Sequence, residues 1–265
     1  MSKRVNEFSD ELNDDFAATQ SIRADRVESD FPYVRGGFGW KLGAFVCYRL
    51  IATPVAWLFC KLGFGLRICG RENLKGIHGG FCLYGNHTQH AADAFIPSLI
   101  SFPRRTYILT GRETVSIPGL RSIVQMMGAM PLPSDAKALP HLQSAIECRL
   151  SQEHVVAVYP EAHIWPYYTH IRPFRAGSFV YPVRCGVPAV PYVVTYRRRR
   201  LLKNLHPFIT VYVGKPIFPD PERPERAERQ RLRDEAYAFM SNTAESVDQP
   251  EYIRYRRKST PATDK

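Results

Sequence analysis

Two histidines and an aspartate follow the first strongly β-prone run of the chain. The run Gly80–Tyr84 is rich in aromatic and apolar residues, and Gly85 ends it. His87, His90 and Asp93 come next. An imidazole has a near-neutral pKa and can take a proton from a hydroxyl group, while a carboxylate can orient the imidazole and stabilise its charged form. We therefore predict that His87 is a general base and that Asp93 is its partner.

A second pairing remains open at the same place. His90 and Asp93 lie about one helical turn apart if a helix begins there. A loop histidine and a helix-capping aspartate without any catalytic role would also fit these residue types. His90 is therefore kept as the alternative base.

Five further short sequence fragments follow Asp93 along the chain. They are Gly128–Asp135 (GAMPLPSD), Val158–His163 (VYPEAH), Pro173–Phe179 (PFRAGSF), Val187–Pro191 (VPAVP) and Val213–Ile217 (VGKPI). Together with Asn86, His87 and Asp93, these fragments resemble the motifs of the glycerophospholipid acyltransferase family. The best-known members of that family are the bacterial lysophosphatidic acid acyltransferases. The resemblance runs from about residue 70 to residue 217.

The resemblance implies a reaction and a set of site residues. A fatty acyl group would pass from acyl-CoA or acyl carrier protein to the hydroxyl group of a lysophospholipid, in phospholipid biosynthesis. The hydroxyl group, deprotonated by His87, would attack the thioester directly, so that no metal, cofactor or acyl-enzyme cysteine is expected. The residues expected to bind substrate or to order the loops around it are Asn86, Glu161, His163, Arg172, Arg175 and Gly177.

The sequence departs from the family pattern in three places. Five residues, not four, separate His87 from Asp93, and the second and third motifs lack their arginines. In the family these arginines are linked to the phosphate of the acceptor. Here Arg172 and Arg175, with His163, would have to supply that charge. The acceptor is therefore expected to be lysophosphatidic acid, another lysolipid or an amphiphilic alcohol. The alternative is a catalytically degenerate family member that binds membranes.

Strand-prone and helix-prone runs alternate after residue 70. The strand-prone runs are Gly80–Tyr84, Arg105–Leu109, Ala129–Leu132, His154–Tyr159, Ala189–Tyr196 and Phe208–Val213, and the helix-prone runs are Ala91–Ile100, Ile117–Met127 and Leu139–Gln152. Such alternation predicts an α/β fold, with a largely parallel or mixed sheet flanked by helices and with chemistry at the carboxyl ends of the strands. We expect the acyltransferase domain over 70–219 and an amphipathic helix over 220–247.

The segment 37–69 contains an apolar run that Lys41 and Lys61 bracket. Because Arg49 and Pro54 interrupt it, we predict one kinked helix or two short helices that dock in a membrane interface. A buried helix pair and a full membrane span are the alternatives. Residues 1–36 are expected to form a polar mobile leader, and 248–265 a basic tail.

The composition limits the kinds of molecule that the protein is expected to bind. The net charge is +11 and the pI is near 9.5, which favours an anionic partner such as membrane lipids. A nucleic-acid partner is not expected, since no binding motif is present and the apolar segment would be unexplained. The six cysteines show no disulfide or metal-site spacing, and no apolar signal peptide is recognised. We expect a peripheral or monotopic protein on the cytoplasmic face of the cell membrane.

Overall fold

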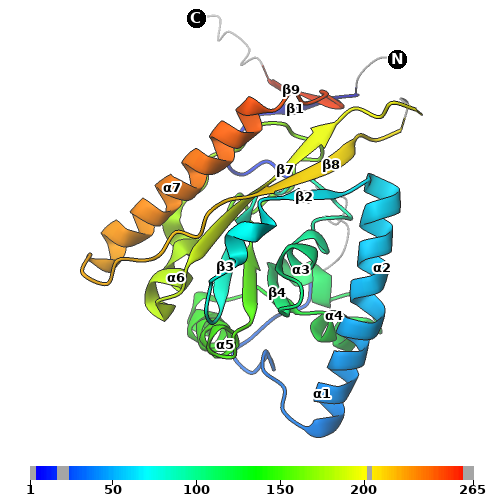
Figure 1. Ribbon diagram of the computed structural model, residues 1–265. Coiled ribbons are helices and arrows are strands. Elements are labelled where there is room, and N and C mark those ends of the chain that lie inside the picture. Colours follow the sequence, from blue (N-terminus) through cyan, green and yellow to red (C-terminus); the bar gives the residue numbers. More distant parts are fainter. Residues whose placement is uncertain (1–3, 17–23, 202–204, 259–265) are drawn as a thin grey trace, which may run out of the picture.

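A computed structural model describes residues 4–16, 24–201 and 205–258 of the chain. Within these residues the strands form a seven-stranded main sheet and a two-stranded sheet (Figure 1). In spatial order the main sheet consists of β2 (Arg67–Cys69), β8 (Phe208–Val213), β7 (Ala189–Arg197), β3 (Phe81–Gly85), β6 (Val155–Val158), β4 (Thr106–Thr110) and β5 (Ala129–Pro131). Only β7 and β8 pair antiparallel among these described strands. The predicted mixed α/β sheet is confirmed.

The strand β3 lies inside the sheet and is buried along its whole length. Side chains of a strand alternate between the two faces. Accordingly, Cys82 and Tyr84 join one hydrophobic cluster, and Phe81 and Leu83 join the other. This double burial fixes the position of the strand end from which His87 projects.

Helices cover both faces of the sheet. The first cluster is covered by α5 (Leu139–Ser151), α6 (Val180–Cys185) and α7 (Glu225–Ser246). The second is covered by α3 (Ile96–Ser101) and the end of a long N-terminal helix, and α4 (Arg121–Met126) lies beside β5. Short 3₁₀ helices fill the connections: η4 (Arg71–Leu74), η5 (Arg112–Val115), η6 (Ala136–Ala138) and η7 (Ala176–Phe179).

The long N-terminal helix is continuous from Phe38 to Gly63, so a single helix is present and the predicted alternative of two short helices is wrong. It consists of α1 (Phe38–Phe45), η2 (Val46–Ala52), α2 (Thr53–Leu58) and η3 (Phe59–Gly63). A proline removes one backbone donor and crowds the preceding turn. The wider π-helical turns of η2 directly before α2 absorb this defect, and the Thr53 hydroxyl donates to the Tyr48 carbonyl at 2.7 Å.

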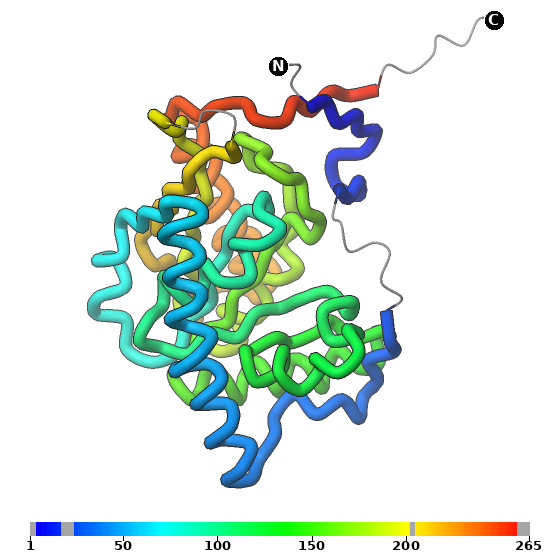
Figure 2. The backbone as a smooth tube through the Cα atoms, turned by 90° about the vertical axis from the view of Figure 1, so that its right-hand side faces the viewer, coloured from blue at the N-terminus to red at the C-terminus, as the bar shows by residue number. Residues whose placement is uncertain are grey.

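One face of this helix packs on the domain along its length (Figure 2). Ala44, Tyr48, Ala56 and Cys60 recur at multiples of four residues and are buried. The Tyr48 hydroxyl accepts the Thr106 N–H at the start of β4, at 2.9 Å. The rest of the surface is open: only 17% of the most apolar window is buried, and its mean hydropathy is 1.6.

The basic run Arg197–Arg200 at the end of β7 contains two bonded and two exposed arginines. Arg199 donates to the Gly63 carbonyl at 2.8 Å, and Arg197 donates to the Gly65 carbonyl. These arginines therefore tie the C-terminal end of the long helix to the β7–β8 hairpin. Arg198 and Arg200, which alternate with them, remain exposed.

The leader and tail are not separate mobile segments where they are described. β1 (Arg4–Phe8) pairs in parallel with β9 (Ile253–Arg257), so part of the predicted mobile leader is a paired strand and the basic tail contains its partner. The chain then buries Val27, Phe31 and Tyr33 in the first hydrophobic cluster. Residues 1–3, 17–23 and 259–265 of the predicted leader and tail lie outside the described residues.

We predict that Gly85→Ala destabilises the fold. A Cβ atom at Gly85 would lie 2.1 Å from the Tyr192 ring, which is fully buried and cannot move aside. Overpacking of this kind costs roughly 1–3 kcal/mol, occasionally more. Chemical denaturation would measure the free energy of unfolding. Gly36→Ala is the control, because nothing lies within 4 Å of that position, and a change within about 0.5 kcal/mol is expected. Equal stability of both variants would contradict the assigned packing.

Candidate active site

The loop after β3 is anchored by Asn86. Its side-chain amide donates to the Val194 carbonyl at 3.0 Å and accepts the Val194 N–H at 2.7 Å. Asn86 thereby continues the pairing of β3 with β7 by one side chain beyond Gly85. It is buried and both its amide atoms are occupied, so that of the two expected roles, binding substrate and ordering the loop, the geometry favours ordering the loop.

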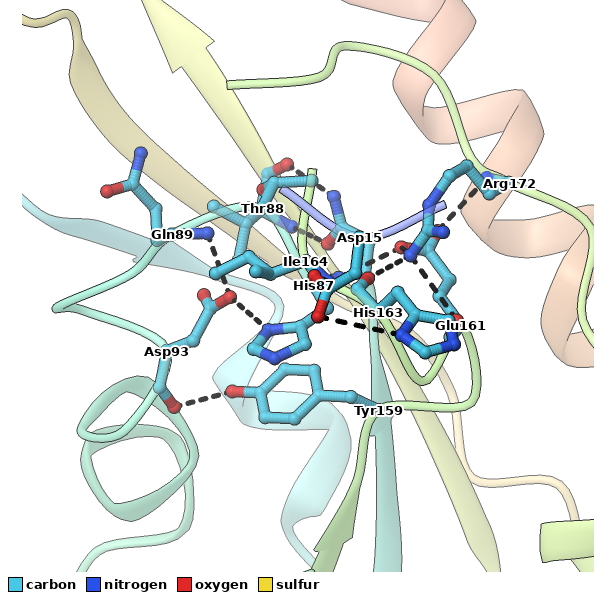
Figure 3. A network of polar contacts seen from close by, with 12 residues as sticks. Asp15, His87, Thr88, Gln89, Asp93, Tyr159, Glu161, His163, Ile164 and Arg172 are labelled. Carbon is cyan, nitrogen blue, oxygen red and sulfur yellow. Dashed lines mark hydrogen bonds and ion pairs between the residues drawn. The ribbon is translucent and has the colours of Figure 1, made fainter. Parts of the chain in front are cut away.

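His87 and Asp93 form a hydrogen-bonded pair (Figure 3). The distance from His87 Nδ1 to Asp93 Oδ2 is 2.8 Å, and the Gln89 N–H donates to the same oxygen at 2.9 Å. A carboxylate at this distance holds the proton on Nδ1 and leaves the lone pair on Nε2. The side chain of Asp93 is 3% exposed and that of His87 is 25% exposed. The arrangement is that of a general base with its orienting carboxylate.

Tyr159 supports both members of the pair. Its ring stacks on the His87 imidazole, with ring centroids 4.4 Å apart, and its hydroxyl donates to the Asp93 carbonyl at 2.5 Å. Burial raises the pKa of Tyr159, so the hydroxyl stays protonated and remains a donor. The sequence indicated only an aromatic residue before Pro160, and its contact with the dyad was missed.

Glu161 joins the two motif loops. One carboxylate oxygen accepts the His87 N–H at 3.1 Å and the other accepts the Arg172 N–H at 3.0 Å. Arg172 also places its guanidinium 3.4 Å from Glu161 Oε2. Burial raises the pKa of Glu161, and the positive charge of Arg172 works against that rise. The structure therefore gives Glu161 the expected role of ordering the loop around His87.

Arg172 is not available to a substrate phosphate, which corrects its predicted role. Its side chain is 1% exposed and lies over the Trp165 ring at 5.0 Å. The guanidinium donates to the Glu11 carbonyl at 3.3 Å and also to the His163 carbonyl. Arg172 therefore balances the buried charge of Glu161 and fastens the N-terminal segment to the motif loop.

The remaining predicted residues lie at different levels of exposure. His163 is partly exposed, with its Nδ1 atom 3.7 Å from Asp15 Oδ2. Arg175 and Gly177 are exposed at the start of η7. These three residues can face solvent or a ligand, whereas Asn86, Glu161 and Arg172 are internal supports.

The five-residue spacing between His87 and Asp93 is absorbed in an irregular loop. No regular helix begins until Ile96, so Asp93 lies in the turn before α3, not in the first helical turn that the sequence had indicated. The Gln89 carbonyl accepts the Asp93 N–H at 3.3 Å. His90 is exposed in this turn, and the ion pair of Asp93 is with His87. The geometry favours His87 over His90 as the base.

Tyr196 and Trp165 also hold the loop after β3 in place, and the sequence indicated neither contact. The Tyr196 hydroxyl donates to Thr88 Oγ1 at 2.7 Å and accepts from Gln89 Nε2 at 3.1 Å. The backbone N–H of Trp165 donates to the His87 carbonyl at 3.1 Å. Tyr196 lies on β7, far from the loop in the sequence, so that only the strand order brings them together.

The comparisons with known proteins agree with this site. The model of the acyltransferase family matches residues 65–195, which include the dyad and Glu161. Residues 65–195 form an acyltransferase-family domain. The predicted family resemblance is thereby confirmed.

A solved structure shares the acyltransferase fold. It is the crystal structure of the 1-acyl-sn-glycerophosphate (LPA) acyltransferase PlsC from Thermotoga maritima, with a TM-score of 0.56 and 16% identity. The match covers 80% of this chain and 89% of that chain. At this identity the likeness shows the fold. Among curated proteins no sequence matches this acyltransferase chain.

We predict that Asn86→Ala lowers both stability and turnover. The change leaves the buried Val194 N–H and carbonyl without partners, each at a cost of about 1–3 kcal/mol. Release of the loop would also misplace His87 and lower kcat about tenfold or more. Denaturation and steady-state kinetics would measure the two effects. Asn73→Ala is the control, because Asn73 makes a similar bond to the Val213 carbonyl at 2.8 Å away from the dyad. Its kcat should be unchanged.

Proposed function

We propose that the protein transfers a fatty acyl group from acyl-CoA or acyl carrier protein to the hydroxyl group of a lysophospholipid, in phospholipid biosynthesis. The observation that carries the proposal is the His87–Asp93 pair, which leaves Nε2 free as a base inside an acyltransferase-family domain. The pair is intact, which favours this function over that of a catalytically degenerate membrane-binding member.

The proposed reaction is a direct displacement. His87 Nε2 takes the proton of the acceptor hydroxyl while the oxygen attacks the thioester carbonyl carbon. The new C–O bond forms, the C–S bond breaks, and the thiol leaves with the proton returned by the imidazolium. Asp93 stabilises the imidazolium in between. No protein nucleophile, metal or cofactor takes part in this scheme, and burial, which raises the pKa of Cys60 to about 12, disfavours its thiolate.

The acceptor in this proposal is lysophosphatidic acid or a related lysolipid. Arg172 is occupied by Glu161, so that Arg175 and His163 are the cations of the predicted set that remain open to a phosphate. One arginine and one histidine give a weaker phosphate contact than paired arginines. A lysolipid with a less charged headgroup is therefore also included in the class.

The membrane attachment that we propose is interfacial. The long helix measures about 39 Å, long enough to cross a bilayer, at about 1.5 Å per residue over 26 residues. However, it contacts the domain from Gly43, beside Met126, to Gly63 at the hairpin. A span would drag the domain into the hydrocarbon, whereas a helix lying in the interface exposes only its apolar face. We place it on the cytoplasmic face, where anionic lipids attract basic proteins.

Dyad variants test the reaction. With purified protein, acyl-CoA and a panel of lysolipids, we expect thiol release and an acylated product identified by mass spectrometry. His87→Ala should lower kcat by roughly 10²- to 10⁴-fold, since general-base catalysis contributes about that much. Asp93→Asn should be similarly severe, and His90→Ala, the matched control, should retain most activity. Loss of turnover in His90→Ala with a mild effect of His87→Ala would overturn the assignment.

The membrane proposal is tested on the exposed helix face. Leu50, Val55 and Trp57 are 61%, 59% and 56% exposed. Changing all three to Gln should strongly reduce sedimentation with vesicles, because each apolar side chain contributes about 1.5–3 kcal/mol on burial. The control changes Leu132, Leu139 and Phe218, which are exposed outside the helix, to Gln. Equal retention of both triple variants would refute the docking face. Resistance to carbonate extraction would indicate a span.

A further inference from the structure

A cavity of about 370 Å³ lies at the amino ends of the parallel strands, whereas the dyad lies at their carboxyl ends. Its floor is formed by Arg105, Tyr107 and His154, at the amino ends of β4 and β6. Its other wall is the segment 32–36 and the first turns of the long helix. His87 follows the carboxyl end of β3, which runs parallel to β6. The cavity is therefore a separate place in the molecule, with a volume typical of small-ligand pockets.

The lining of the cavity is strongly basic. It includes Arg35, Lys41, Arg105 and Arg149, and it contains no carboxylate. None of these four cations takes part in an ion pair in the described part of the chain. Partly buried charges in proteins are normally paired. Arg35, Arg105 and Arg149 are partly buried and Lys41 is exposed. Three partly buried cations around one small space without an acid call for a partner from outside the chain.

The guanidinium groups are held in place by neutral groups. Arg105 donates to the Met126 carbonyl at 2.6 Å, and Arg149 donates to the Tyr33 carbonyl at 3.2 Å. Both lie over the Tyr107 ring, at 5.0 Å and 4.5 Å from its centroid. The Nε atoms of Arg105 and Arg149 are buried without a hydrogen-bond partner. The aromatic faces orient these groups, and neither the ring nor the two carbonyl groups bring a negative charge to them.

The same pattern continues at the mouth of the cavity. The Arg35 guanidinium lies 4.4 Å from the centroid of the Trp40 ring, and its Nε atom is also buried without a partner. On the opposite side, burial and the charges of Arg105 and Arg149 lower the pKa of His154 to about 4. The imidazole is therefore neutral at pH 7, mainly because it is buried and further because the neighbouring guanidinium groups disfavour its protonation.

We propose that this cavity binds a phosphate-bearing anion, as the headgroup of an anionic phospholipid or as a soluble phosphate ester. The planar guanidinium fork matches the oxygens of phosphate, and several forks around one point give the charge density that a phosphate monoester or diester requires. Trp40 and Lys41 belong to the start of the long helix, so the mouth opens where the proposed docking helix begins. The site stands independently of the acyl-transfer reaction.

Binding of two soluble probes to the full-length protein tests the site. Calorimetric titration with inorganic phosphate and with glycerol 3-phosphate should give one binding event in the wild type. The double variant Arg35→Gln/Lys41→Gln removes two charges that make no hydrogen bond to the described body of the protein. It should weaken binding about tenfold or more, since each lost cation removes a charge-assisted hydrogen bond to the phosphate.

The control variant Arg226→Gln/Lys75→Gln loses the same charges at exposed positions outside the cavity. It should bind like the wild type, and so should His87→Ala, which keeps the test separate from catalysis. Displacement of glycerol 3-phosphate by vesicles containing phosphatidylglycerol, but not by phosphatidylcholine vesicles, would identify a lipid headgroup as the ligand. Binding without displacement would identify a soluble ester. Absence of binding, or equal binding in the cavity and control variants, would overturn the proposal.

Discussion

The carboxylate of Glu161 is the contact on which the candidate active site depends. It accepts the backbone N–H of His87 from one motif loop and that of Arg172 from another, and it is itself buried. A buried carboxylate is stable only with partners that balance its charge, and Arg172 supplies both a positive charge and hydrogen bonds. Arg172 in turn reaches the Glu11 carbonyl of the N-terminal segment. The dyad is thus held by a chain of contacts that ends at the N-terminal segment.

This chain of contacts explains how the site tolerates an irregular loop. A loop of polar residues would be poorly fixed by its own sequence, because it has no regular backbone hydrogen bonds. Here Asn86 and Tyr196 fasten it to β7, and Glu161 and Trp165 fasten it to the segment after β6. Catalytic geometry needs such support, since small displacements of a base are costly. The extra residue before Asp93 is accommodated because the loop is held from outside.

Much of the fold could be predicted from local sequence. The β-prone runs are short, apolar and bounded by glycine or charged residues, so each of the six predicted strands is present, with ends shifted by one or two residues at most. Motif order likewise placed His87, Asp93 and Glu161 at one sheet edge. The pairing of β1 with β9 could not be predicted, because it joins opposite ends of the chain through exposed polar strands. The choice between one helix and two at Pro54 could not be made from the sequence either, because a π-helical turn can absorb a proline and no residue type signals that turn.

Arg172 shows where residue type alone fails. An arginine near a Pro-Glu motif has the right charge for a phosphate, but only the fold reveals that the guanidinium of Arg172 forms an ion pair with Glu161. The reverse holds for Arg35, Arg105 and Arg149, which lie far apart in the sequence and gave no pattern, yet meet around one cavity. Burial and pairing thus decide whether an arginine of this protein supports the fold, as Arg172 does, or lies around a cavity without an ion pair to any described residue, as Arg35, Arg105 and Arg149 do.

The long helix connects the two ends of the sheet at which chemistry and anion binding are proposed. Its C-terminal end lies beside the dyad, because Phe59 packs on Phe95, two residues after Asp93, with ring centroids 5.9 Å apart. Its N-terminal turns line the basic cavity through Trp40 and Lys41. A membrane surface along the exposed face of the helix would therefore pass close to both places at once. In that orientation an acyl chain could remain in the lipid while its thioester reaches His87, and an anionic group at the other end would fix the angle of the domain on the surface. The continuity of the helix through Pro54 is what makes such a single orientation possible, since a hinge there would let the two ends dock independently.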